Sequence, residues 1–115
     1  MRFRRVRRES PNLATGSDGV LTYGSLTLDL AGHLAFGGQR TLRLSHLQFV
    51  VLAALVRGGG RVVATSDLLG AAATVIVPSP RTVPAVISRL RRELRREDGL
   101  PAIVLVRSRG YRMVA

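Results

Sequence analysis

Lysine, cysteine and tryptophan are absent from this 115-residue chain, and each absence limits what the protein can be. Without cysteine the chain forms no disulfide and no thiolate metal site, which is typical of a cytoplasmic protein. Without lysine, all 18 basic residues are arginines, whose planar guanidinium groups suit phosphates and guanine edges. The two tyrosines and three phenylalanines are too few for the stacking platform that single-stranded nucleic acid requires.

Long apolar runs are also missing. The longest, FVVLAALV at Phe49–Val56, falls far short of the ~20 residues that a membrane span needs, so no membrane partner is expected. The N-terminus is basic but has no apolar segment behind it, so the sequence does not predict a signal peptide. Acidic residues number only 7, which leaves a formal charge of +11 and indicates nucleic acid as the partner.

The length suits one small folded domain rather than two. Residues 1–19, MRFRRVRRESPNLATGSDG, pass from an arginine cluster into Ser, Pro, Asn and Gly, and predict a basic flexible tail or linker. A remnant of a lost upstream domain is the alternative. Residues 20–115 predict the folded domain. Even residues 21–115 carry 13 arginines against 5 acidic residues, a formal charge of +8.

The folded part begins with short alternating segments followed by a helix. Residues 20–44 alternate and turn repeatedly, which predicts a small antiparallel sheet of three or four strands with a hairpin turn at Gly37–Gly38. Residues 45–57 predict a helix, because Ser45 and Gln48 have the spacing of a capping box and three glycines follow.

A second, shorter helix is predicted for TSDLLGAAA, starting at Thr65 or Ser66. Gly70 lies near its middle and weakens it, since glycine costs ~1 kcal/mol in a helix interior. The following segment, TVIVPSP, predicts a loop closed by two prolines.

The segment Arg81–Glu97, RTVPAVISRLRRELRRE, predicts a helix with one apolar stripe and one arginine face. The stripe recurs at helical spacing and consists of Val83, Ile87, Leu90 and Leu94. On the opposite face lie Arg81, Ala85, Ser88, Arg89, Arg92 and Arg96, with Arg91 and Arg95 on the flank. A merely solvated face usually mixes in acids, whereas Glu93 lies off this face, so we favour contact with nucleic acid.

Pro84, near the front of this helix, constrains where the helix begins. If Thr82 caps the helix, Pro84 takes its second position, where no intrahelical donor is required. If Ser79 caps it with Pro80 first, Pro84 removes one backbone hydrogen bond and bends the first turn. We favour the late start at Thr82.

The last segment, AIVLVRSRGYRMVA, alternates and turns at Ser108–Arg109–Gly110, which predicts a hairpin carrying Arg107 and Arg109 at its tip. A sheet, three helices and a basic hairpin after an arginine-faced third helix form a winged helix-turn-helix layout. The predicted fold class is therefore α+β, with an N-terminal antiparallel sheet, a three-helix core and a C-terminal β-hairpin wing.

Three stretches of the chain form a specific combination: LTLDLAGHLAFGGQRTLRLSHLQFVVLAALVRGGGRVV, RTVPAVISRLRREL and VRSRGYRM. Together they resemble the OmpR/PhoB-type DNA-binding domain of bacterial response regulators, from about Leu21 to Val114. The resemblance implies transcriptional regulation by a two-component-like protein. It also implies that the third helix enters the major groove of double-stranded DNA and that the wing lies at the minor groove.

The resemblance assigns roles to individual positions. Arg89 matches a position that often contacts a base, and Arg107 matches the wing residue placed at the minor groove. Phosphate contacts are implied for Arg81, Ser88 and Arg91. The helical wheel instead turns Arg92 outward, and the hairpin pattern adds Arg109, so both belong to the predicted DNA-binding set.

Departures from the family pattern carry expectations of their own. Ala64 replaces the usual serine cap of the second helix, so we expect the cap one or two residues later. Ala73 stands where a tryptophan often occurs, and the loop after it, which can contact RNA polymerase in relatives, is shortened. RNA polymerase is therefore only a candidate second partner. Ser108 replaces the first wing glycine, which is expected to alter the turn.

The chain leaves no room for the receiver domain of ordinary response regulators. We expect either a stand-alone regulator or an effector domain excised from a longer one. It should be a monomer in solution that pairs in tandem on DNA. No cofactor, metal or catalytic residue is expected.

Enzymatic function is not indicated. His33 and His46 have no cluster of partners in the sequence, and Gly58–Gly60 lacks the lysine and Ser/Thr of a phosphate loop. The main hypothesis is sequence-specific binding of double-stranded DNA. Two alternatives stay open: a winged-helix module that docks an acidic protein, and RNA or ribosome binding.

Overall fold

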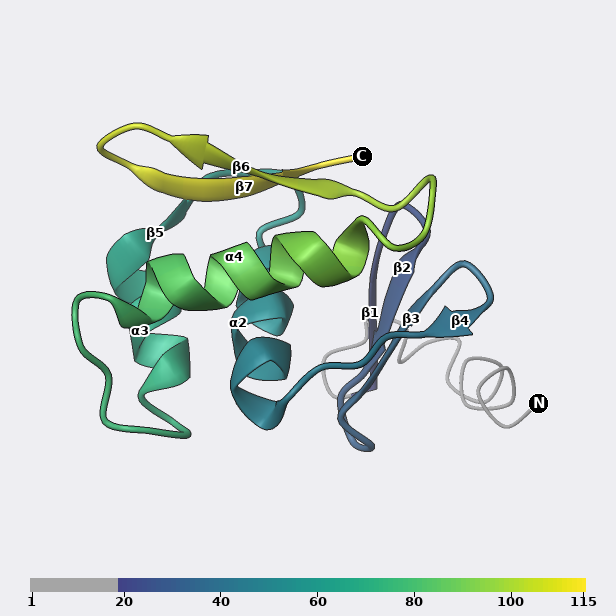
Figure 1. Ribbon diagram of the computed structural model, residues 1–115, viewed down its shortest axis with the longest axis horizontal. Coiled ribbons are helices and arrows are strands. Elements are labelled where there is room, and N and C mark those ends of the chain that lie inside the picture. Colours follow the sequence, from purple (N-terminus) through teal and green to yellow (C-terminus); the bar gives the residue numbers. More distant parts are fainter. Residues whose placement is uncertain (1–18) are drawn as a thin grey trace.

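Four short strands, three helices and a C-terminal hairpin follow one another along residues 19–115, the part of the chain that this computed structural model describes. This order confirms the predicted α+β winged helix-turn-helix class. The predicted basic tail over residues 1–19 lies outside the described residues, apart from Gly19. Figure 1 shows the four-stranded sheet at one end of the helices and the hairpin lying along the last helix.

Short strands build the N-terminal sheet, in which neighbouring strands are antiparallel and follow one another in sequence order. They are β1 (Val20–Tyr23), β2 (Leu26–Asp29), β3 (Leu34–Gly37) and β4 (Arg40–Thr41). Leu26 and Leu28 face the core and are fully buried, as alternation along a strand requires. The hairpin turn is Gly38–Gln39 rather than the predicted Gly37–Gly38, because Gly37 still pairs within the ladder.

The first two helices begin in different ways. α2 (His46–Arg57) has the predicted capping box: the Ser45 hydroxyl accepts the Gln48 N–H at 3.1 Å, and the Gln48 side chain accepts the Ser45 N–H at 2.7 Å. α3 (Thr65–Ala72) begins after Ala64, whose side chain offers no cap hydrogen bond. The predicted shift of this cap is therefore wrong, because strand pairing already holds Ala64 in place.

α4 (Thr82–Leu94) turns the predicted apolar stripe into the core. Its buried residues are Val83, Val86, Ile87, Leu90 and Leu94. The N-cap is Arg81 rather than the predicted Thr82, because the Thr82 hydroxyl accepts the Ser79 N–H at 2.9 Å instead of capping the helix. Pro84 is consequently the third helical residue, and the residue after it makes the first backbone hydrogen bond of the helix. The proline thus removes no hydrogen bond, as the late start predicted.

The C-terminal hairpin belongs to a second sheet of strand order β5-β7-β6. Its strands are β5 (Val63–Ala64), β6 (Ala102–Val106) and β7 (Gly110–Val114). Three residues form the tip, Arg107 to Arg109, where the Arg109 N–H donates to the Val106 carbonyl at 2.9 Å. Ser108 has a φ of 64°, the left-handed conformation that favours glycine, so this serine occupies a turn position suited to glycine.

One core joins these elements. Besides Leu26 and Leu28 of β2, fully buried members come from α2, α3, α4 and β7 and include Leu52, Leu55, Leu68, Leu90 and Met113. In the described part no polar or charged residue is buried, so each of its arginines reaches the surface to some degree. Across residues 19–115, no helix combines the length and the apolar character needed to cross a bilayer.

Candidate nucleic-acid interface

An open face runs along α4 on the side away from the core. Four exposed residues at helical spacing form what we call the outer line of α4: Arg81, Ala85, Ser88 and Arg92. Two small side chains therefore lie between two arginines. A partner can come closest to the helix backbone at Ala85 and Ser88, while the two guanidinium groups reach to either side.

Arg89 lies beside the outer line, on the flank that faces the start of α2. Its side chain is exposed, and together with Ala85, Ser45 and Gln48 it lines a shallow hollow of about 210 Å³. It makes no ion pair with any residue of the described part. The predicted base-contacting residue thus lies next to the small residues, where a partner comes closest.

The acidic residues near α4 are directed away from the outer line. Glu93 accepts the backbone N–H of Arg43 at 2.8 Å and pairs with Arg96 at 3.4 Å, which ties α4 to the segment before α2. Glu97 pairs with Arg40 of β4 at 3.4 Å. The sequence indicated that Glu93 lies off the arginine face but not what it binds. Within residues 19–115, no carboxylate forms an ion pair with an arginine of the outer line.

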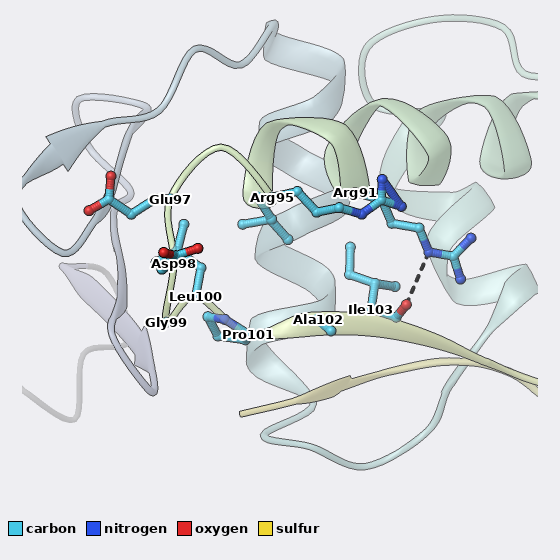
Figure 2. Close-up of a pocket in the computed structure, with 10 residues that line it drawn as sticks. Arg91, Arg95, Glu97, Asp98, Gly99, Leu100, Pro101, Ala102 and Ile103 are labelled. Carbon is cyan, nitrogen blue, oxygen red and sulfur yellow. Dashed lines mark hydrogen bonds between the residues drawn. The ribbon is translucent and has the colours of Figure 1, made fainter.

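Arg91 differs from its neighbours on α4. It is only partly exposed, and its Nε donates a hydrogen bond to the main-chain carbonyl of Ile103 in β6 at 3.0 Å (Figure 2). The helical wheel placed Arg91 on the flank of the helix, and the structure agrees. No signal in the sequence pointed to its contact with the wing.

The remaining predicted residues lie at the hairpin tip. Arg107 and Arg109 are both exposed there, and Figure 1 shows the tip directed toward the N-terminal end of α4. Arg112 of β7 donates from Nε to the Gly60 carbonyl at 3.0 Å and so ties the hairpin to the turn after α2. The structure therefore exposes six of the seven predicted DNA-binding residues on α4 and the tip, and buries part of Arg91.

The two histidine side chains stack against each other although they are 13 positions apart in the sequence. The rings of His33 and His46 stack with centroids 4.6 Å apart, because the turn before β3 lies over the start of α2. Two imidazoles alone do not make a metal site, and the described residues contain no group of three or more metal-ligating side chains.

Comparison with known sequences decides the family. A family model described as "Transcriptional regulatory protein, C terminal" matches residues 38–113, which is more than half of the chain. The chain belongs to this family. It is an OmpR/PhoB-type DNA-binding domain, as the resemblance implied, and the family consists of transcriptional regulators rather than enzymes.

Solved structures and curated relatives agree with the OmpR/PhoB assignment. The DNA-binding domain of CpxR from E. coli is 31% identical, with a TM-score of 0.72 over 85% of this chain and 98% of that one. The RstA domain of Klebsiella pneumoniae, solved in complex with the RstA box, is 28% identical, with a TM-score of 0.67 over 83% of this chain and 96% of that one. RegX3 of Mycobacterium tuberculosis is 30% identical over 110 residues, 94% of this chain and 48% of the relative. The chain thus spans about half the length of the curated relatives it matches.

Proposed function

We propose that this domain binds double-stranded DNA in a sequence-specific manner and so regulates transcription, with α4 in the major groove and the hairpin at the neighbouring minor groove. The observation that carries the proposal is the outer line of α4, which has exposed arginines at both ends and small residues between them. The major groove, about 12 Å wide, admits an α-helix, and small residues let the helix backbone approach its floor. Membership of a family whose domains bind DNA supports the same conclusion.

The proposed contacts divide into one that specifies sequence and several that position the domain. Arg89 is proposed to bind a guanine, whose O6 and N7 accept two hydrogen bonds from one guanidinium. Phosphate contacts, which carry no sequence information, are proposed for Arg81, Ser88, Arg91 and Arg92. The tip residues Arg107 and Arg109 are proposed to lie at the minor groove.

Selection of bound duplexes from a random pool tests the proposal. One preferred site should be enriched, and single-stranded DNA or RNA should compete weakly, because no Phe or Tyr ring of the described part is exposed for base stacking. If no site is enriched and an acidic polypeptide or an RNA displaces the duplex, the domain has a different partner.

RNA polymerase is proposed as a second partner through the loop between α3 and α4. Val77 in this loop is 95% exposed and Ile76 is 40% exposed. Apolar side chains that face solvent beside a DNA-binding face suit contact with a protein. Activation in a purified transcription assay should fall when Val77 is replaced by serine, while affinity for the duplex stays unchanged.

Binding to duplex DNA should weaken steeply with salt. About 6 phosphate contacts at roughly −0.9 each predict a slope near −5 for log K against log salt concentration. The charge of +8 on residues 21–115 supports that number of contacts. Titration of a labelled duplex between low and physiological salt measures the slope. Removal of residues 1–19 should flatten it and leave the preferred site unchanged, whereas an affinity indifferent to salt contradicts the proposal.

The domain should be a monomer in solution and should pair only on DNA. Its positive charge opposes self-association, and the phosphates of tandem half-sites about one helical turn apart, ~10 bp, remove that repulsion. Light scattering at micromolar concentration, with and without a duplex that contains two half-sites, measures this. A stable dimer without DNA would show that the pairing surface does not depend on DNA.

A further inference from the structure

The hydrogen bond from Arg91 Nε to the Ile103 carbonyl joins the two elements that are proposed to meet DNA. Among residues 19–115 it is the only side-chain hydrogen bond between α4 and the hairpin. β6 is an edge strand of its sheet, since β7 is its only strand partner within the described residues. An edge strand directs alternate carbonyls outward with no strand to receive them, and Arg91 satisfies the one at Ile103.

We propose that Arg91 is a positioning residue that sets the wing at the angle to α4 that DNA binding requires, beyond any phosphate contact that its two Nη groups make. The inference rests on the proposed DNA binding and adds a role that the other arginines of α4 do not share. The other arginines of the predicted set on α4 direct their guanidinium groups at DNA, whereas Arg91 also donates from one guanidinium nitrogen, Nε, to the protein itself.

The hydrogen bond lies where a change in the orientation of β6 alters the position of the hairpin tip. Ile103 is 4% exposed, so its side chain is anchored in the core while its carbonyl meets Arg91. The strand continues without interruption from there to the turn, and Arg107 follows Ile103 by four positions, roughly 13 Å at ~3.3 Å per residue. A small tilt of the strand at Ile103 therefore moves Arg107 relative to α4.

The surroundings of the hydrogen bond are open rather than packed. Arg91 and Arg95 lie along one wall of a hollow of about 440 Å³, and the start of β6 lies along another (Figure 2). In the described part neither arginine has an ion-pair partner. The core and the pairing with β7 hold Ile103 in place, and the Arg91 contact bridges the open space between α4 and the start of β6, so it bears on the angle between the strand and the helix.

Three substitutions separate the donor from the charge. Arg91→Gln places an amide N–H donor at the position of Nε, because both nitrogens follow Cδ, and it removes the charge. Arg91→Lys keeps the charge but places a carbon at that position. Arg91→Ala removes both. The matched control is Arg95→Ala, one turn further along the same wall, where no hydrogen bond to β6 is made.

The experiment measures the affinity for the selected duplex with and without Arg107→Ala, in the wild type and in each of these variants. We expect a loss of about tenfold in the wild type, in Arg91→Gln and in Arg95→Ala, but less than about twofold in Arg91→Lys and Arg91→Ala, where the tip is no longer held in place. The salt slope reports on the charge of Arg91: it should become shallower by about one in Arg91→Gln if the Nη groups also contact a phosphate.

The outcomes are distinct. If Arg107→Ala costs the same in every Arg91 background, Arg91 acts by charge alone and the positioning role is wrong. If Arg107→Ala costs nothing even in the wild type, the tip does not meet DNA and the positioning role is wrong as well. If no duplex is preferred at all, the proposed function itself is overturned. Thermal unfolding first shows which variants fold, and the pair Arg91→Gln and Arg91→Lys decides the question should Arg91→Ala not fold.

Discussion

Arg89→Ala should weaken binding to the preferred site about 10- to 100-fold and leave the affinity for random duplex almost unchanged. Arg89 lies beside Ala85 and Ser88, where the backbone of α4 can approach the groove floor most closely. A bidentate contact to guanine discriminates by ~1–3 kcal/mol, whereas a phosphate contact supports every sequence equally. Titrations against the preferred site, its single-base variants and random duplex measure the effect, and preference should relax at one base pair.

Arg92→Ala is the matched control, because Arg92 is exposed on the same helix at the end of the outer line. It should weaken preferred and random duplex together and make the salt slope shallower by about one. Arg96→Ala should matter less, since Arg96 lies past the end of α4 and pairs with Glu93. If Arg89→Ala lowers all affinities equally, α4 is only a charged surface and the base-contacting residue is another one.

Gly110→Ala should destabilise the fold by about 3–5 kcal/mol. Gly110 begins β7 with a φ of 149°, a conformation that L side chains rarely adopt. A Cβ at this position would also overlap the carbonyl of Val63 in β5, and backbone atoms held in a strand pair cannot move aside. Thermal unfolding followed by circular dichroism measures the loss, at roughly 4–8 °C per kcal/mol for a domain of this size.

Gly70→Ala makes the same chemical change with the opposite expected sign. Gly70 lies within α3 and is exposed, and a Cβ there would meet no atom within 4 Å. Alanine should therefore stabilise the helix by about 0.5–1 kcal/mol through its higher helix propensity. A fall in unfolding temperature comparable to that of Gly110→Ala would show that the close approach of β5 to β7 is not what requires glycine.

Sequence patterns correctly predicted those features that depend only on residues close together in the chain. The capping box at Ser45 and the buried stripe of α4 were both predicted from spacings of three and four residues, since a helix brings such positions onto one face. The capping residues of α3 and α4 were misjudged for the opposite reason, although α3 begins at Thr65 as predicted. Ala64 is held by a strand that pairs with the far end of the chain, and Thr82 is engaged by the turn before it.

The sequence by itself determined the fold class, the arginine face of α4 and the basic tip of the hairpin, because periodicity and charge are properties of neighbouring residues. Only the tertiary structure decided which arginines of α4 stay open to a partner. Arg91 donates a hydrogen bond to the carbonyl of Ile103, 12 positions away. Glu93 accepts a hydrogen bond from the backbone N–H of Arg43, 50 positions away. Such contacts depend on how the sheet and the hairpin pack against the helix, and this packing cannot be predicted from the spacing of residues along the chain.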